Sequence, residues 1–328
     1  MDTVTHLIMG VGLAGLAQVD PAVAADPAAS AAVLIGTVAG SQAPDLDGLT
    51  RLRSNALYVR HHRGITHSLP AVVLWTVLIA GGLALAFPGV PAPVLTRWVF
   101  IAVALHVFMD LFNSYGTQAL RPFTEKWIAL NVLHIFDPVI FGAHAAAIVL
   151  WLFNLARADI VFPMMYALLA VYVAWRSATH ARLTARLPQI DSRAEPKDRY
   201  ELVPTVHPNQ WNVIKTKPDG AYVLGEWKRG TLAWVDEAHC ARHPAVEASK
   251  QHPDIAAFLY YSTHPCAELK HHPWGYEVRW IDVRYRHRKQ YPFVGVVLLD
   301  RSLRPLNSYV GWLGNKRIGK KLRLDSYS

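Results

Sequence analysis

The chain has 328 residues, 52% hydrophobic side chains and a formal net charge of +9. Residues 1–186 carry 11 Lys/Arg and 9 Asp/Glu, whereas residues 187–328 carry 22 and 15, so most of the positive charge is C-terminal. This uneven distribution excludes a uniform soluble chain and predicts two domains, 1–186 and 187–328. The two cysteines, Cys240 and Cys266, are too few for a disulfide framework, so we expect two buried free thiols.

The first domain contains long apolar segments that predict membrane helices. A span needs about 20 apolar residues, and four segments reach or approach this length: 69–87, 94–113, 135–156 and 160–176. Two shorter segments, 6–19 and 31–43, are rich in Gly and Ala, which lets helices pack closely in lipid. We therefore predict a mainly α-helical membrane bundle of about six segments with four clear spans, followed by a smaller soluble α+β domain.

Basic residues in the connecting loops predict the membrane face that each loop occupies. If the segments alternate, the loops at 44–68 and 114–132 share one side with the C-terminal domain. These two loops carry six Lys/Arg residues, whereas the loops on the opposite side carry Arg157 alone. The positive-inside rule therefore predicts a multi-pass inner (plasma) membrane protein whose C-terminal domain is cytoplasmic.

A motif just before the third apolar segment, HHRGITHS at 61–68, is the most specific signal of chemistry. It contains His62 and His67, and histidine is the commonest protein ligand of zinc-like metals. Arg63 offers a planar guanidinium suited to phosphate or carboxylate. A basic helix cap is the alternative interpretation, but it explains Arg63 and not the histidines. We therefore expect the histidines to bind a metal and Arg63 to take part in catalysis.

Other acidic residues and histidines lie at the ends of neighbouring segments. PDLDGL follows the second segment, and turn chemistry is the alternative to metal ligation by its aspartates. HVFMD places a histidine and an aspartate four residues apart on one helix face, where a polar pair with other helices is the alternative. A histidine also begins the first segment, and there a solvated side chain is the alternative. The predicted topology brings these segments to one membrane face. The expected metal ligands are His6, Asp45, Asp47, His62, His67, His106 and Asp110, and the expected catalytic residues are Asp45, Asp47 and Arg63.

Three further polar residues on the same side, Asn113, His134 and Asp137, are expected to support the ligands. Asp137 precedes Pro138, so a helix N-cap is its alternative role. Imidazole and carboxylate donors suit a divalent metal. Zinc is the first expectation, and manganese and iron are alternatives. The absence of thiolates near the motifs argues against a cysteine-type structural zinc site.

Together these motifs resemble a known family. The Thr-His pair near the N-terminus, PDLD, HRGITHS and HVFMDLFNSYGT are similar to motifs of bacterial inner-membrane metal-dependent hydrolases, also described as LexA-binding, inner-membrane-associated hydrolases, over about residues 1–180. The resemblance implies metal-site roles for the seven expected ligands. The layout is also distantly similar to zinc-dependent phospholipase C and P1 nuclease, which cleave phosphoesters, although this chain lacks an obvious later histidine-and-glutamate pair like theirs.

The C-terminal domain begins after a polar stretch at 187–200 that predicts a linker. Alternating segments then predict an antiparallel sheet, namely WNVIKTK, AYVLGEW, YEVRWIDVRYRH and YPFVGVVLLD. A helical stretch is expected near 244–262. Six of the histidines here, at 239, 243, 264, 271, 272 and 287, are scattered and predict surface or core roles. The basic tail NKRIGKKLRL is expected to be solvated, with anionic lipid head groups as the alternative contact.

The leading functional hypothesis is a membrane-bound metal-dependent hydrolase that acts at the cytoplasmic face on a phosphoester or lipid-like substrate. The alternative is a membrane-tethered regulatory or interaction protein, in which the metal is structural and the basic C-terminal domain binds a protein partner. The expected partners are the lipid bilayer, such a substrate and a regulatory protein, whereas direct nucleic-acid binding is not expected. A metal transporter is a third hypothesis, but it predicts ligands near the membrane midplane instead of at segment ends.

Overall fold

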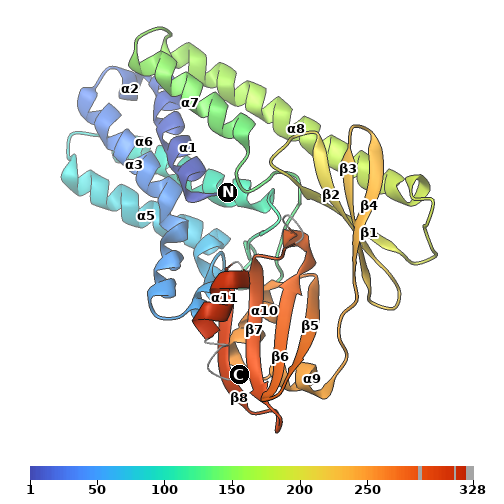
Figure 1. The fold of residues 1–328 in the computed structure, drawn as a ribbon. Helices are drawn as coiled ribbons and strands as arrows, with labels where there is room; N and C mark the ends of the chain where they lie inside the picture. Colours follow the sequence, from blue (N-terminus) through green and yellow to red (C-terminus); the bar gives the residue numbers. More distant parts are fainter. Residues whose placement is uncertain (287–289, 314, 323–328) are drawn as a thin grey trace. The chain divides into compact units, whose positions relative to one another are not determined.

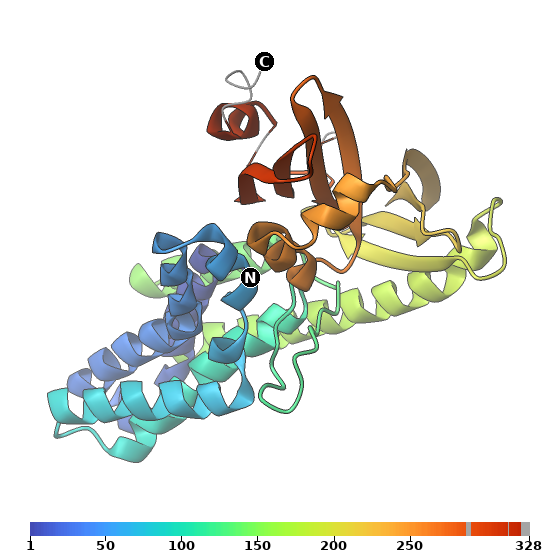
Figure 2. The same ribbon diagram turned by 90° about the horizontal axis from the view of Figure 1, so that it is seen from below.

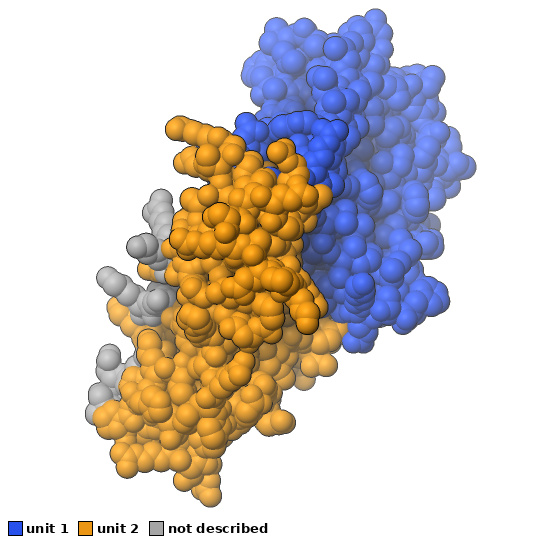
Figure 3. Space-filling model, turned by 90° about the vertical axis from the view of Figure 1, so that its right-hand side faces the viewer, with its two compact units in different colours: residues 1–47, 63–183, 204–210 blue, residues 48–62, 184–203, 211–328 orange. Residues whose placement is uncertain are grey.

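The computed structural model describes residues 1–286, 290–313 and 315–322. Contacts divide the chain into two compact units, which are coloured separately in Figure 3. The first unit, helical, comprises residues 1–47, 63–183 and 204–210, and the second comprises residues 48–62, 184–203 and 211–328. The second unit therefore includes a short stretch of the N-terminal half, which lies between Asp47 and Arg63 in the chain.

The helical unit consists mainly of α-helices, with a long non-helical segment at 112–137 between α6 and α7 (Figure 1). Its elements are α1 (Thr3–Leu16), η1 (Ala17–Val19), α2 (Pro21–Ala24), α3 (Pro27–Gln42), the first half of η2 (Ala43–Leu52), η3 (Ile65–His67), α5 (Leu69–Ala86), α6 (Ala92–Leu111), α7 (Pro138–Leu152) and most of α8 (Ala158–Ile190). Several helices begin at an acidic or hydroxyl N-cap followed closely by proline, which fixes where each helix starts.

Close packing of small residues holds the helices together. Helix α3 packs against both α1 and α6, and α5 packs against α6, so these four helices run side by side (Figures 1 and 2). A Cβ atom at Gly40 of α3 would lie 3.1 Å from Ala102 Cβ on α6. The glycine thus brings the end of α3 against the second half of α6.

Three helices among the described residues are long and apolar enough to cross a membrane: α5, α6 and α8, with 18, 20 and 33 residues. The expected span at 135–156 contains only the 15 residues of α7. At 1.5 Å per residue that helix is about 22 Å long, short of the roughly 30 Å hydrocarbon layer. The N-cap at Asp137 and the positive φ of Asn154 limit its length. The expected span at 160–176 lies within α8, which continues to Ile190 and shortens the predicted linker to 191–198.

The second unit contains two four-stranded sheets. The first has the order β1-β2-β3-β4 and the second the order β5-β6-β7-β8, and the pairs β3–β4, β5–β6, β6–β7 and β7–β8 are antiparallel. The strands are β1 (Arg199–Pro204), β2 (Gln210–Thr216), β3 (Tyr222–Lys228), β4 (Thr231–Ala238), β5 (Pro265–His272), β6 (Gly275–Asp282), β7 (Phe293–Asp300) and β8 (Pro305–Trp312). The prediction of an antiparallel sheet is thereby confirmed in this part of the chain.

Short helices accompany these sheets, namely α4 (Asn55–His61), α9 (Pro244–Ser249), α10 (Pro253–Tyr261), η4 (Val283–Tyr285) and α11 (Asn315–Leu322). The helical stretch expected at 244–262 is split, because Pro253 begins a second helix that His252 caps. Helix α10 packs on β7 and β8, and α4 packs on α10. The segment expected as one long strand ends at Asp282, and His287 lies outside the described residues. The end of the basic tail, beyond Leu322, also lies outside them.

Cys240 and Cys266 form a disulfide between the segment after β4 and strand β5. The prediction of two free thiols is therefore wrong. The two cysteines are 26 residues apart in sequence, and the antiparallel fold brings their backbones together with a Cα–Cα distance of 4.9 Å, which suits a disulfide.

Candidate metal centre

Four side chains from three segments of the helical unit converge at one point. Asp45 comes from η2, His67 from η3, and His106 and Asp110 from the last turns of α6. Each residue offers one ligand atom, and these atoms all lie within 4.8 Å of one another. The structure thus brings together four of the seven expected ligands, although Asp45 and Asp110 are 65 residues apart in the sequence.

The distances within this four-residue cluster fit a shared cation. His67 Nε2 lies 3.4 Å from Asp45 Oδ1 and 3.4 Å from Asp110 Oδ2. His106 Nε2 lies 3.7 Å from Asp45 Oδ1 and 3.6 Å from Asp110 Oδ2. The two Nε2 atoms are 3.3 Å apart. Two nitrogen and two oxygen donors therefore surround a common centre, which is the donor type and number of a tetrahedral divalent site.

The outer nitrogen of each imidazole has a partner that fixes its tautomer. His106 Nδ1 donates to the carbonyl oxygen of Ser41 at 2.7 Å. Thr66 Oγ1 donates to Asp47 Oδ2 at 2.6 Å, so its oxygen is free to accept from His67 Nδ1 at 3.0 Å. This network assigns the ring protons to both Nδ1 atoms and leaves a lone pair on each Nε2. Such orientation by outer partners is typical of metal-binding histidines.

Two carboxylate oxygens of the cluster are buried and lack hydrogen-bond donors. Asp45 Oδ1 and Asp110 Oδ2 accept no hydrogen bond from the described residues. An uncompensated buried carboxylate oxygen is expensive. The His67 and His106 nitrogens that face these oxygens carry lone pairs instead of N–H groups. The four-residue cluster therefore fits a bound cation better than a hydrogen-bonded network.

The electrostatics of residues outside the candidate membrane spans agree with this interpretation. Burial alone raises the pKa of the Asp45 carboxyl, but the adjacent His67 imidazole, followed by His106 and Arg63, holds that pKa well below its usual range. Burial lowers the pKa of His67 and outweighs the opposing effect of Asp45 and Asp47. An ionised carboxylate beside a neutral imidazole is the protonation state that metal binding requires.

The other three expected ligands are not members of this four-residue cluster. His6 stacks on the ring of His106 with centroids 3.6 Å apart, and its Nε2 lies 2.8 Å from the Met1 amino group and 3.2 Å from Asp110 Oδ1. Asp47 faces the outer nitrogen of His67 and accepts from Thr66, so it orients a ligand. His62 belongs to the second unit, where its ring stacks on Tyr58.

The expected supporting residues have separate roles. Asn113 Nδ2 donates to Asp110 Oδ1 at 3.1 Å and thus supports the cluster directly. Asp137 accepts hydrogen bonds from Val139 N and Ile140 N at the start of α7, so its position is that of a helix N-cap, the alternative role. His134 Nδ1 forms a hydrogen bond with the backbone of Phe136 and is not part of the cluster.

Two partners of the cluster were not expected from the sequence. Ser41 contributes its backbone carbonyl, which no side-chain pattern can reveal. Thr66 lies inside HHRGITHS, directly before His67. A hydroxyl side chain next to an expected ligand histidine is the sequence feature that could have identified it.

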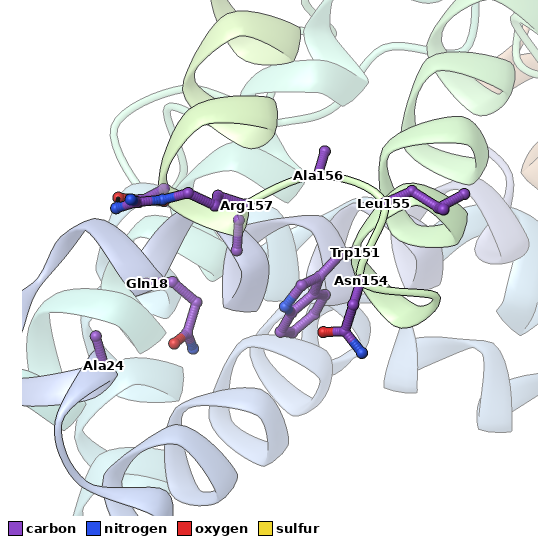
Figure 4. Close-up of a pocket in the computed structure, with 9 residues that line it drawn as sticks. Gln18, Ala24, Trp151, Asn154, Leu155, Ala156 and Arg157 are labelled. Atoms are coloured by element: carbon purple, nitrogen blue, oxygen red, sulfur yellow. Dashed lines mark hydrogen bonds and ion pairs between the residues drawn. The ribbon is translucent and has the colours of Figure 1, made fainter.

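A surface cavity of about 490 Å³ lies elsewhere in the helical unit. Figure 4 shows Gln18, Trp151 and Asn154 bordering it beside Arg157. Gln18 follows His6 by 12 residues, mostly along α1, so about 18 Å separates this cavity from the cluster. The cavity is therefore distant from the four-residue cluster.

Comparisons with known proteins support a membrane location for the helical part. Residues 1–183 match the family model described as YdjM inner membrane protein, and residues 244–322 match the YfhP C-terminal alpha/beta plait domain. The chain is 41% identical to the uncharacterized protein YfhP of Bacillus subtilis (strain 168), over 99% of this chain and 100% of that relative. No solved structure matches. The family model and the apolar helices together indicate an inner membrane protein, and the chain belongs to the YdjM inner membrane protein family.

Proposed function

We propose that this protein is a membrane-embedded metal-dependent hydrolase whose centre is formed by Asp45, His67, His106 and Asp110. The observation that carries the proposal is the convergence of two imidazole lone pairs and two unpaired carboxylate oxygens within one buried cluster. A divalent ion held there would supply the Lewis acidity that activates water and polarises a phosphoryl or carbonyl group. Zinc is the metal we favour, with manganese and iron as alternatives.

The exposure of the ligands supports a single route of approach. The side chain of Asp45 is 14% exposed, whereas His67, His106 and Asp110 are fully buried. A reacting group therefore approaches past Asp45. Leu46 follows Asp45 in the sequence and Ile65 lies two residues before His67, and their side chains are 50% and 61% exposed. Exposed apolar side chains close in sequence to the ligands favour a phosphoester or ester carried on a lipid-like molecule.

The test is a hydrolysis screen on the full-length protein purified in detergent. The substrates are bis-(p-nitrophenyl) phosphate, a p-nitrophenyl ester and vesicles of anionic phospholipid, each assayed with added zinc or manganese and with a chelator. The proposal expects chelator-sensitive hydrolysis that His106→Ala abolishes. Hydrolysis that persists in His106→Ala would assign it to a contaminant.

A second candidate function is a membrane-tethered interaction protein with a structural metal. The observation that favours it is the burial of three of the four ligands, because structural sites are closed whereas catalytic sites keep an open position. A protein that retains its metal and hydrolyses none of the substrates, and whose cobalt-substituted form shows no response to added azide, would support this candidate.

We also propose that the C-terminal domain is cytoplasmic and that the protein is multi-pass. Arg51, Arg53, Arg60 and Arg63 precede α5, and positively charged loops are retained in the cytoplasm. The Cys240–Cys266 disulfide argues for the opposite side, because disulfides are rare in the reducing cytosol. Labelling with a membrane-impermeant maleimide decides between the two.

A further inference from the structure

The two carboxylate oxygens of Asp110 have different surroundings. Oδ2 faces the imidazoles of the cluster and accepts no hydrogen bond from the described residues. Oδ1 lies 3.2 Å from Arg63 Nη2, accepts from Asn113 Nδ2 at 3.1 Å and contacts the Met1 amino group. Because all of these donors are on Oδ1, the carboxylate is held with its other oxygen presented to the centre.

Arg63 is fixed by contacts on several sides. Its backbone N–H donates to Asp47 Oδ2 at 2.9 Å, and its φ of 62° places it in the left-handed region. Nη1 donates to Asn113 Oδ1 at 3.0 Å and Nη2 to the Met1 carbonyl at 2.9 Å. The guanidinium carbon also lies 5.4 Å from the ring centroid of Tyr115. The residue is 3% exposed, so its terminal nitrogens are occupied inside the protein.

Asn113 completes the arrangement because its amide orientation is determined. Its Oδ1 accepts from Arg63 Nη1 and from the backbone N–H groups of Tyr115 and Gly116, at 3.0, 2.9 and 3.1 Å. Three donors on one atom identify it as oxygen. The Nδ2 group must therefore face Asp110, and Asn113 links the turn after α6 to the ligand on α6.

We propose that Arg63 and Asn113 are positioning residues that hold Asp110 Oδ1, so that Asp110 binds the metal through Oδ2 alone. The proposal rests on the proposed metal centre. It differs from the sequence-based expectation that Arg63 takes part in catalysis. Charge-assisted hydrogen bonds from a planar guanidinium give both strength and direction, which a lysine cannot reproduce.

The experiment measures metal affinity and coordination in the full-length protein in detergent. Zinc affinity is obtained by competition with a chromophoric chelator, and the visible spectrum of the cobalt-substituted protein reports ligand geometry. The variants are Arg63→Lys, Arg63→Gln and Asn113→Asp. Asn113→Asp keeps the acceptor that organises the turn and replaces the donor to Asp110 by a carboxylate oxygen that repels Asp110 Oδ1, so it tests this contact even if an Arg63 variant fails to fold. Arg53→Gln, at an exposed position, is the matched control.

We expect Arg63→Gln and Asn113→Asp to weaken zinc binding by about 10- to 100-fold, the range for outer partners of metal ligands. Both should change the cobalt spectrum, Arg63→Lys should recover only part of the affinity, and Arg53→Gln should match the wild type. Wild-type affinity and an unchanged cobalt spectrum in Asn113→Asp would overturn the positioning role and leave the metal centre intact. A wild-type protein that binds neither zinc nor cobalt would overturn the metal centre and this role together.

Discussion

His67 Nε2 and His106 Nε2 lie 3.3 Å apart in the interior of the helical unit. The outer nitrogens of both rings already have partners, in Thr66 and in the Ser41 carbonyl. The two facing nitrogens therefore each carry a lone pair, and two lone pairs at this distance repel. A cation between them would remove the repulsion and satisfy the nearby carboxylate oxygens of Asp45 and Asp110, which would account for the burial of the four residues together.

Asp47 should act through His67 instead of binding the metal itself. Asp47→Asn keeps the size of the side chain but removes the charge that Thr66 and the outer nitrogen of His67 face. We expect zinc affinity to fall by about 10- to 100-fold, whereas Asp45→Asn, which removes a ligand charge, should cost more. Chelator competition measures the zinc affinity of both variants, and Asp159→Asn, in the first turn of α8, is the control. Equal losses in Asp45→Asn and Asp47→Asn would show that both are ligands.

Gly12 should be essential for packing of α1. An added Cβ would lie 2.6 Å from His144 Cδ2 and 3.1 Å from Tyr166 Oη, and both rings are packed inside the unit. We expect Gly12→Ala to reduce stability by about 1–3 kcal/mol through overpacking. Gly142→Ala is the matched control, because no atom lies within 4 Å of its added Cβ. Its stability should be unchanged or slightly higher. Thermal unfolding in detergent compares them, and equal melting temperatures for the two variants would contradict the packing argument.

Acid should weaken the first sheet through Asp191. Burial raises the pKa of this carboxyl, but hydrogen bonds from Lys215, Arg193 N, Tyr200 and Trp234 bring it to about 2. The unfolded value is about 3.9. The stabilisation is thus fully present above that value and is lost as pH falls through about 2.

Urea unfolding between pH 5 and pH 2, followed by tryptophan fluorescence, measures this effect. Trp234 Nε1 donates to Asp191 Oδ1 at 3.0 Å and serves as a local reporter. Asp191→Asn should be less stable at pH 5, because Lys215 loses its nearest charge partner, and should show a shallower loss toward pH 2. Asp236→Asn, at an exposed position, should follow the wild type. A slope in Asp191→Asn as steep as in the wild type would contradict this assignment.

The disulfide should stabilise the second unit. Replacing both Cys240 and Cys266 by serine should lower the free energy of unfolding by about 2–4 kcal/mol, since the bond closes a loop of 26 residues. Mass spectrometry under non-reducing conditions should find both thiols protected from alkylation. Two freely alkylated thiols in protein purified without reductant would show that the bond is absent.

Labelling with a membrane-impermeant maleimide should locate the C-terminal domain. In the serine variant, Lys228→Cys places one thiol at an exposed position of β3. A cytoplasmic domain predicts labelling only after cells are opened. Labelling of intact cells would place the domain outside, in agreement with the disulfide and against the arginine distribution.

The four metal-site residues were predictable because each lies where an apolar segment begins or ends, and alternation of segments sends those ends to one face. The sequence does not predict the roles of Asp47 and His6. Residue spacing does not show whether a side chain contacts a metal ion directly or contacts an imidazole next to it. Residues 48–62 were likewise assigned to the membrane part, whereas α4 packs with α10 in the second unit. The sequence pattern alone does not predict strands β1, β4, β5 and β8. Each of these strands includes exposed positions, whereas β7 is a nearly continuous buried apolar run, and strand pairing supplies what the local pattern does not.

Metal analysis of the purified protein tests the central claim most directly. Full-length protein in detergent is dialysed against metal-free buffer, and its divalent metal content is measured beside that of His106→Ala, Asp110→Ala and the control His134→Ala. The four-residue cluster predicts about one divalent ion per chain in the wild type and the control, and loss of that ion in the two ligand variants. A wild-type protein without metal, or ligand variants that retain the full metal content, would contradict the account.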